Sequence, residues 1–351
     1  MPLETFCLIV AFLFGINIGS FLNVAIWRLP RGGSIVEPQW SYCPRCEHRL
    51  GALDLFPVFS FLLLGRKCRY CKGRISWRYP AIELLTGLLF VAVTYKFGPT
   101  VDSVFYCLFV AALVCVFFID LEHFVIPDGL NVLTVLIGIA HNLTAIYLHE
   151  PNQWVNVAGV HIPASIVGAL GYAAVIYSIG LGYIVFMGLI GRGKNPVWAG
   201  WNYIKENVGD WAWITVYYAG SIVPPLRKFV EQPEPLEGTT ADEIKEDEDG
   251  GAMGGGDGKL AAGIGANIFV ALALQSMVWA VFLGAFFGLA LIIKQRRSLD
   301  GRTAIPFGPW MVAGALIAMF VGNDILHWYV ANFLTFPTTP LPPGNLGGTA
   351  P

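Results

Sequence analysis

The chain has 351 residues, of which 55% are hydrophobic and only 13% are charged, whereas about 25% are charged in a typical soluble domain. This composition excludes an ordinary water-soluble globular protein, and the net charge of -2 gives no sign of a nucleic-acid partner. We therefore expect an all-α protein that crosses a lipid bilayer several times.

Seven apolar stretches carry this expectation. A membrane-spanning helix needs about 20 apolar residues, and six of the stretches have lengths suited to a single crossing. The stretch 260–293 is longer, and as one straight helix it would measure about 50 Å against a hydrocarbon core of about 30 Å. The seven stretches are 6–27, 79–97, 103–119, 129–147, 162–190, 260–293 and 305–333.

Basic residues indicate the orientation of these stretches. From Arg28 to Arg78 the chain has ten Lys or Arg and three acidic residues, and such loops stay on the cytoplasmic side. Basic residues also follow 260–293, so both of its flanks are expected to be cytoplasmic. The stretch must then cross twice, which gives about eight membrane helices with both termini outside.

The chain is thus divided into six expected parts. Residues 231–249 hold nine acidic residues and one lysine, a composition typical of disorder, and no internal repeat is evident. The parts are a first membrane helix (1–27), a cytoplasmic cysteine-bearing loop domain (28–78), membrane helices two to five (79–190), a cytoplasmic insertion with the acidic tract (191–253), membrane helices six to eight (254–335) and a Pro/Gly-rich tail (336–351).

Two Cys-x2-Cys pairs lie in the basic loop, formed by Cys43, Cys46, Cys68 and Cys71. Two pairs at this spacing can supply the four thiolates of a tetrahedral zinc site. A disulfide is disfavoured by a reducing cytoplasm, and no strand–helix pattern supports a thioredoxin-like redox pair. We expect a structural zinc ion that holds a small zinc-ribbon-like domain together.

Two aspartates stand at the cytoplasmic membrane edge, where ionisable residues are costly and therefore candidates for function. Asp120 ends the run LVCVFFID, and Asp257 begins the run DGKLAAGIGANIF. Facing carboxylates can activate water, one as base and one as acid. The helix dipole favours an anion at an N-terminus, so we predict Asp257 as base and Asp120 as acid. The alternative is that each aspartate caps a helix or reaches to the interface.

Nearby charged residues are given structural roles. Asp128, after Pro127, is expected to start and cap a helix. Glu122 and His123 are expected to be solvated, and Lys259 is expected to flank the membrane edge.

Asp257 follows three glycines, Gly254, Gly255 and Gly256. A phosphate-binding P-loop does not fit, because Met253 and Leu260 occupy positions that require Gly and Ser or Thr. A flexible linker does not explain a charged residue at a membrane entry. We expect the three glycines to let an extended substrate strand lie against the backbone.

Six segments, in order and over most of the chain, resemble the motifs of one family. They are GSFLNVAIWRLPR at 19–31, the two Cys-x2-Cys pairs, ISWRYPAIELLT at 75–86, IDLEHFVIPD at 119–128, MGGGDGKL at 253–260 and IPFGP at 305–309. The family is that of the bacterial type IV prepilin peptidases, which are leader peptidases and N-methyltransferases and share a Gly-x-Gly-Asp motif with presenilin-like proteases.

The resemblance implies that Asp120 and Asp257 are the catalytic pair of a membrane aspartyl protease. Such an enzyme cleaves the basic leader of prepilins or type II secretion pseudopilins after glycine, on the cytoplasmic side of the bacterial inner membrane. The resemblance also implies methylation of the new N-terminus from S-adenosylmethionine. No glycine motif marks a site for this methyl donor, and Glu83 is the candidate residue.

The insertion 191–253 is longer than the family pattern, and its acidic tract would attract a lysine-rich leader. Two other functions stay open from the sequence. One is a zinc-ribbon membrane scaffold or transporter-like protein without catalysis, which would tolerate Asp→Asn changes. The other is a related Gly-x-Gly-Asp intramembrane protease with a different substrate, which only substrate trials would separate.

Overall fold

The computed structural model describes residues 2–189, 203–204, 255–295 and 306–334. Within these ranges, seven helices are long and apolar enough to cross a membrane, so the prediction of an all-α polytopic membrane body is confirmed. They are α1 (Leu3–Arg28), α3 (Arg78–Phe97), α4 (Val101–His123), α5 (Asp128–Tyr147), α6 (Ala164–Leu189), α9 (Gly255–Gln295) and α10 (Gly308–Tyr329). Of the predicted insertion, 191–253, only Tyr203 and Ile204 are described. The predicted tail, 336–351, lies outside the described residues.

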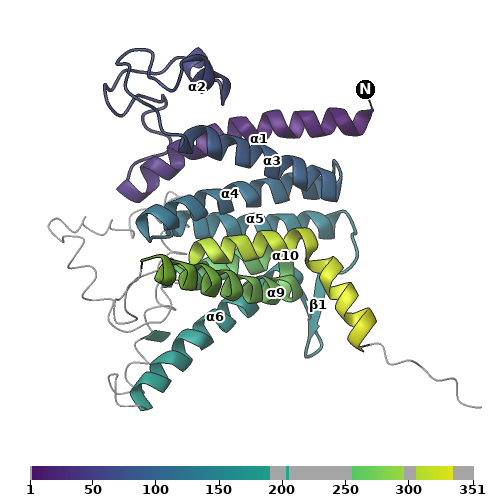
Figure 1. Ribbon diagram of the computed structural model, residues 1–351. Helices are drawn as coiled ribbons and strands as arrows, with labels where there is room; N and C mark the ends of the chain where they lie inside the picture. Colours follow the sequence, from purple (N-terminus) through teal and green to yellow (C-terminus); the bar gives the residue numbers. More distant parts are fainter. Residues whose placement is uncertain (1, 190–202, 205–254, 296–305, 335–351) are drawn as a thin grey trace, which may run out of the picture.

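The helices form a stacked bundle (Figure 1). The pair α1 and α3 lies at one edge, α4 and α5 in the middle, and α9, α10 and α6 towards the other edge. Close contact of α1 with α3 depends on glycine, because a Cβ at Gly19 would lie 2.7 Å from Glu83 Cα. Small residues allow helices to approach closely in a membrane protein. This contact places Glu83 directly beside α1.

The loop between α1 and α3, residues 29–77, lies at one end of the bundle, which we call the cysteine end (Figure 1). It contains two short 3-10 turns, Leu29–Arg31 and Ala52–Asp54, and the short helix α2 (Phe59–Leu63). A π-helical turn, Val330–Leu334, extends α10 at the opposite end. The start of α1 and the end of α10 therefore share the opposite end, as expected for two termini on one side.

Helix α4 is the centre of the core. Phe109, Val110, Leu113 and Val116 are fully shielded from solvent, and α1, α3, α5 and α10 all contact this helix. Asp120 lies in its last turns, at the cysteine end. The most enclosed helix of the bundle therefore carries the first predicted catalytic residue.

Helix α9 is interrupted at Phe269, which has φ 59° and ψ 175°. The part before Phe269 runs parallel to α5, because Lys259 pairs with Asp128 and a Cβ at Gly138 would touch Ala266. This first part has a length of about 21 Å, which is less than the hydrocarbon core of about 30 Å. The chain therefore reverses at Phe269 while it is still packed beside the other helices, and within the described range Gly255–Gln295 no loop outside the bundle separates the two parts of α9.

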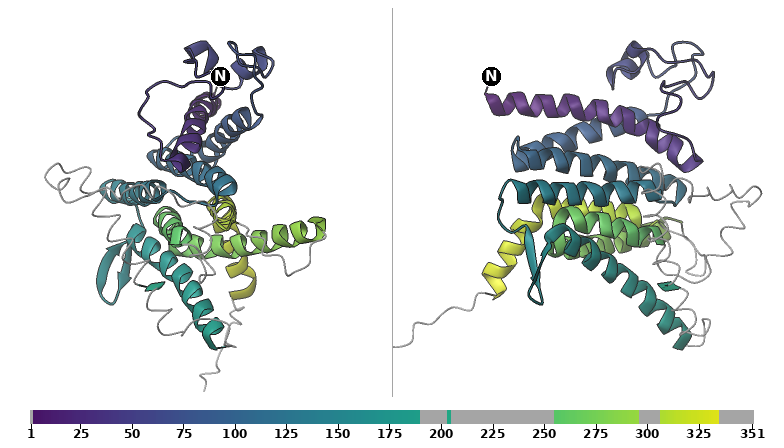
Figure 2. Two further views of the ribbon diagram at one scale, coloured as in Figure 1. Left: turned by 90° about the vertical axis from the view of Figure 1, so that its left-hand side faces the viewer. Right: turned by 180° about the vertical axis from the view of Figure 1, so that it is seen from behind.

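The second part of α9 runs back along α10, which it leaves obliquely in the end-on view of Figure 2. A Cβ at Gly314 would lie 3.0 Å from Ala280 N, whereas Gly284 lies against Trp310 nearer the start of α10. Helices α5 and α10 both start near the C-terminal end of α4, so they run in the same direction. The first part of α9 is parallel to α5 and the second part is antiparallel to α10. The two parts of α9 therefore run in opposite directions. The expected entry and return of the chain thus occur within one bent element whose first part is shorter than a full crossing, which is why seven long helices are found rather than eight.

A β-hairpin between α5 and α6 was not predicted. β1 (Trp154–Val157) and β2 (Val160–Pro163) are antiparallel, with Trp154 opposite Pro163 and Val157 opposite Val160. The sequence indicated only a loop at 148–161, because four-residue strands are too short to give a periodic signal. The turn residues Ala158 and Gly159 both have positive φ, 51° and 88°.

Candidate functional site

Asp120 is buried at the end of α4, with 5% of its surface exposed. The backbone N–H of Gly308 lies near the carboxylate. Its Oδ2 is nevertheless shielded from solvent and accepts no hydrogen bond of normal geometry from the part of the chain that the structure describes. An unpaired buried carboxyl oxygen lowers stability. Asp120 is therefore a candidate for function rather than for structure.

Asp257 lies in the first turn of α9 and is half-buried. Its neighbour Gly256 packs against Ile126, because a Cβ at Gly256 would lie 3.4 Å from Ile126 Cβ. Ile126 also approaches Gly308, with 3.1 Å between its Cδ1 and a Cβ built there. Gly308 is the residue against which Asp120 lies. Ile126 therefore links the segments of both aspartates at the cysteine end.

The glycines before Asp257 are only partly described. Gly255 and Gly256 form the start of α9 and are half-buried, whereas Gly254 lies outside the described residues. The sequence did not single out Ile126 or Gly308. The signal for both was present in the stretches IDLEHFVIPD and IPFGP, which come together only in the folded bundle.

Two ion pairs lie near the aspartates, and they involve residues for which the sequence predicted no partner. Lys259 is buried and its Nζ donates to Asp128 Oδ1 at 3.0 Å, because α9 starts beside α5 rather than at an exposed edge. Asp128 starts α5 but does not cap it; the N-cap is Pro127. Glu122 is not merely solvated, since it accepts hydrogen bonds from the Arg78 guanidinium at the start of α3.

The four cysteines of the loop come together. Their sulfur atoms all lie within 4.8 Å of one another, and Cys43 Sγ is 4.0 Å from Cys71 Sγ. Zinc–sulfur bonds of about 2.3 Å in a tetrahedron place the sulfurs about 3.8 Å apart, so the cluster fits one metal ion. Burial raises the pKa of Cys43, but hydrogen bonds from the Arg45 and Cys46 backbone N–H groups lower it to about 7, which favours the metal-binding thiolate.

Each cysteine pair lies in a turn of the same form. The N–H of Glu47 donates to Cys43 O at 2.8 Å, and the N–H of Lys72 donates to Cys68 O at 3.0 Å. Both donors have positive φ, 55° and 57°, and each turn is closed by one β-bridge, Tyr42 with Arg49 and Lys67 with Arg74. The loop is therefore a structural repeat. The sequence did not reveal it, because little besides the cysteines is shared between the two turns.

A cavity of about 600 Å³ lies between α1, α3 and the cysteine loop. Glu83 lines it and is 8% exposed; its Oε2 accepts a hydrogen bond from Val58 N–H at 2.7 Å, and Ser20 also donates to this carboxylate. Asn23 lines it too, with its Nδ2 donating to Tyr79 O at 3.1 Å. Asn23 Oδ1 is buried without a hydrogen bond from the described residues.

The wall of this cavity is shaped by aromatic rings and one arginine. Trp27, Tyr42 and Tyr79 line it. The buried Arg28 guanidinium donates to four backbone carbonyls of the loop, those of Ser34, Ile35, Pro38 and Trp40. A cavity of this size with apolar walls and a few fixed polar atoms is typical of a small-molecule site.

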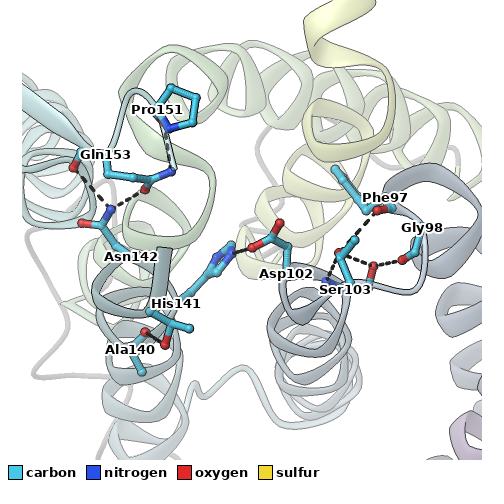
Figure 3. Close-up of polar contacts among 11 residues, drawn as sticks. Phe97, Gly98, Asp102, Ser103, Ala140, His141, Asn142, Pro151 and Gln153 are labelled. Carbon is cyan, nitrogen blue, oxygen red and sulfur yellow. Dashed lines mark hydrogen bonds and ion pairs between the residues drawn. The ribbon is translucent and has the colours of Figure 1, made fainter. Parts of the chain in front are cut away.

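A second polar cluster lies at the opposite end of α4 and α5 (Figure 3). His141 Nε2 is 2.9 Å from Asp102 Oδ1, and the His141 ring stacks on Phe105. The next residue, Asn142, donates to Gln153 Oε1 at 2.6 Å and so holds the base of the hairpin. Eighteen residues of helix separate Asp102 from Asp120, or about 27 Å, so this cluster fastens the helices and does not belong to the candidate site.

The fold and these sites define a multi-pass membrane protein with a four-cysteine cluster that could hold a metal ion and two acidic helix ends on the same side of the bundle. Residues 13–97 match the family described as Bacterial Peptidase A24 N-terminal domain. No solved structure matches the chain.

Several relatives carry the name prepilin leader peptidase/N-methyltransferase, among them three from the genera Aeromonas, Myxococcus and Dichelobacter. The protein from Aeromonas hydrophila is 29% identical over 93% of this chain and 94% of its own length. The protein from Myxococcus xanthus (strain DK1622) is 47% identical over 37% of this chain and 38% of its own. The protein from Dichelobacter nodosus is 31% identical over 51% of this chain and 67% of its own. The chain belongs to the prepilin leader peptidase/N-methyltransferase family, as the sequence motifs indicated.

Proposed function

We propose that this protein cleaves the basic leader of a type IV prepilin or type II secretion pseudopilin after glycine and then N-methylates the new N-terminus. The names of the relatives give both activities. The observation that best supports the peptidase is the contact of the Asp257 turn and the Asp120 segment through Ile126. The site faces the cytoplasm of the bacterial inner membrane, because the basic loop 28–78 lies at the same end.

In the proposed peptidase reaction, Asp257 is the base and Asp120 the acid, since the helix dipole favours an anion at the start of α9 and a neutral group at the end of α4. The Asp257 carboxylate takes a proton from water while the water oxygen bonds to the glycine carbonyl carbon. Asp120 donates its proton to the carbonyl oxygen. Asp257 then protonates the amide nitrogen, the C–N bond breaks, and Asp120 recovers a proton from the diol.

The glycines Gly254, Gly255 and Gly256 are proposed to accept the extended substrate beside Asp257. A backbone without side chains lets a second strand approach closely. Ile126 limits the space on one side of Gly256, so the substrate would lie on the other. This arrangement brings the scissile carbonyl towards both carboxyl groups.

We place S-adenosylmethionine in the cavity between α1, α3 and the cysteine loop. Its volume of about 600 Å³ suits an adenosine-sized ligand, and its aromatic rings suit an adenine base and a sulfonium cation. Asn23 Oδ1 offers an acceptor without a partner among the described residues, and Glu83 offers the buried carboxylate. When bound, the donor supplies an electrophilic methyl group; the residues of this chain bind and orient it.

We also propose that Cys43, Cys46, Cys68 and Cys71 hold a structural zinc ion. The fit of the four sulfur atoms supports this ligand set. The ion would fix the two turns of the loop relative to each other and so preserve the wall of the cavity. It takes no part in bond cleavage.

The two activities can be tested with a synthetic prepilin and S-adenosylmethionine labelled in the methyl group. We expect Asp120→Asn and Asp257→Asn each to abolish cleavage while methylation of pre-cleaved pilin persists. Glu83→Gln is expected to abolish methylation of pre-cleaved pilin while leader cleavage persists. Full cleavage by either Asn variant would refute the dyad, and a wild-type protein that processes no prepilin or pseudopilin would favour a scaffold or a protease for another substrate.

A further inference from the structure

Two tyrosines pack beside the turn that carries Asp257. Tyr177 of α6 lies against Gly258, the residue after Asp257, and a Cβ at Gly258 would be only 2.7 Å from Tyr177 Oη. Such a distance is too short for any side chain. Gly258 therefore has to lack a side chain so that the Tyr177 ring can rest directly on the turn.

The second ring is that of Tyr203, which belongs to the segment between α6 and α9. It packs against Gly180, where a Cβ would lie 2.8 Å from Tyr203 Cζ. Gly180 follows Tyr177 by three residues, so both positions lie on one face of α6. The rings of Tyr177 and Tyr203 meet edge to face, with 6.4 Å between their centroids and 72° between their planes, a favourable aromatic geometry.

Tyr203 is also enclosed and lies close to Asp257. Its Oη is shielded from solvent. Burial raises the pKa of Tyr203, and the neighbouring charges of Tyr177 and Asp257 raise it further. The phenol therefore stays neutral at physiological pH, and its influence on the turn comes from packing rather than from its own charge.

We propose that Tyr203 is a positioning residue for the peptidase. Its ring holds Tyr177 against Gly258 and so fixes the turn that carries Asp257. The inference rests on the proposed peptidase function, which it deepens by giving part of the long segment 191–253 a role in that reaction. Tyr203 itself transfers no proton and binds no substrate.

The first test compares Tyr203→Ala, Tyr203→Phe and Ile204→Ala. Because a misplaced catalytic group costs about 10- to 100-fold in rate, we expect Tyr203→Ala to lower kcat for leader cleavage by about that factor with little change in KM. Tyr203→Phe keeps the ring and should retain most of the rate. Ile204 is the exposed neighbour, at 43%, and its replacement should have no effect.

The pH profile separates positioning from general destabilisation. If Tyr203 fixes Asp257, then Tyr203→Ala should move the acidic limb of the kcat/KM profile, since the surroundings of that carboxylate change. A merely structural role would reduce the amount of active enzyme and leave the limb in place. That outcome, or a cleavage rate for Tyr203→Ala equal to wild type, would overturn the inference.

A double-mutant cycle with Gly180→Ala gives independent evidence. In the wild-type background the added methyl group would displace the Tyr203 ring, so we expect Gly180→Ala to slow cleavage as Tyr203→Ala does. In the Tyr203→Ala background the space is vacant and Gly180→Ala should be silent. Equal effects in both backgrounds would refute the contact.

Two controls keep this inference distinct from the proposed function. Thermal unfolding in detergent and methylation of pre-cleaved pilin are measured for every variant, and both should match wild type. A wild-type protein that cleaves no prepilin would overturn the proposed function itself. A wild-type protein that cleaves, together with a fully active Tyr203→Ala variant, would overturn this inference alone.

Discussion

At Asp120 the packing leaves no room for a methyl group on the neighbouring residue. A Cβ at Gly308 would lie 3.1 Å from Asp120 Cγ, nearer still to Oδ2, and 3.1 Å from Ile126 Cδ1. Contacts this short require one of the two side chains to move. Asp120 packs on Gly308, and Ile126 contacts both Gly308 and the turn that carries Asp257. A side chain at position 308 would therefore shift the two aspartates relative to each other.

We therefore expect Gly308→Ala to reduce leader cleavage by about 10- to 100-fold, the range for a displaced catalytic group. Methylation of pre-cleaved pilin should be retained, because the cavity beside Glu83 is formed by other helices. Gly182→Ala is the matched control, since a Cβ at Gly182 meets nothing within 4 Å. Cleavage kinetics of the two variants at equal protein concentration give the comparison, and equal rates would contradict the expectation.

Residues that carry charge were only partly predictable. Asp120 and Asp257 stood out because ionisable residues at a membrane edge are costly, with helix capping as the alternative; their catalytic role stays a prediction. The pair of the buried Lys259 with the partly exposed Asp128 and the pair of His141 with Asp102 were missed, because each joins residues that are remote in the sequence. The hydrogen-bond partner of a side chain is a property of the packed bundle, which a local pattern does not contain.

At the scale of single elements, zinc binding by the four cysteines of the loop can be tested directly. We expect the purified protein to hold one zinc ion per chain and Cys68→Ser to lose most of it, with reduced methylation and retained cleavage. Cys7→Ser, which changes a cysteine in α1 outside the cluster, is the control. An unchanged zinc content in Cys68→Ser would contradict the proposed ligand set.

The same loop predicts a pH dependence for metal uptake. The pKa of Cys43 is lowered from 9.0 to about 7, so its thiolate is present above that pH and is protonated below it. Metal binding requires the thiolate. The pKa of its partner Cys46 is raised to about 11, so protons compete with the metal over the whole range between the two values. Zinc uptake by metal-free protein should therefore weaken steadily as the pH falls, which titration with a zinc indicator would measure.

The elements differ in how far the sequence determined them. Helix α4 was predictable because a run of about 20 apolar residues has few other structures open to it. For α9, the basic residues beyond residue 293 indicated that the chain returns to its starting side. The position of the reversal was not predictable, because Phe269 lies in an apolar run and carries none of the usual breaker signals.

At the scale of the whole molecule, the two proposed activities belong to different parts of the bundle. The cavity lies between α1, α3 and the cysteine loop, whereas the aspartates belong to α4 and α9. The ion pair of Arg78 with Glu122 connects the two parts. The family motifs predicted both activities, but only the fold reveals that the residues proposed for them belong to separate helix pairs.

The acidic tract 231–249 allows a prediction about substrate capture by the intact protein. Nine acidic residues in this tract should attract a lysine-rich leader at low ionic strength, and salt should screen the attraction. Deletion of 231–249 is expected to raise KM for prepilin several-fold at low salt and to have little effect at high salt. A KM that is unchanged at low salt would refute this role.

The reversal of α9 at Phe269 also has a consequence for biosynthesis. The first part of α9, about 21 Å long, is too short to span a bilayer on its own, so it depends on the second part and on α10 to stay in place. Gly308, which packs against Asp120, is likewise part of α10. We therefore expect the nascent chain to stay proteolytically silent until its last membrane helix has left the ribosome and entered the bilayer.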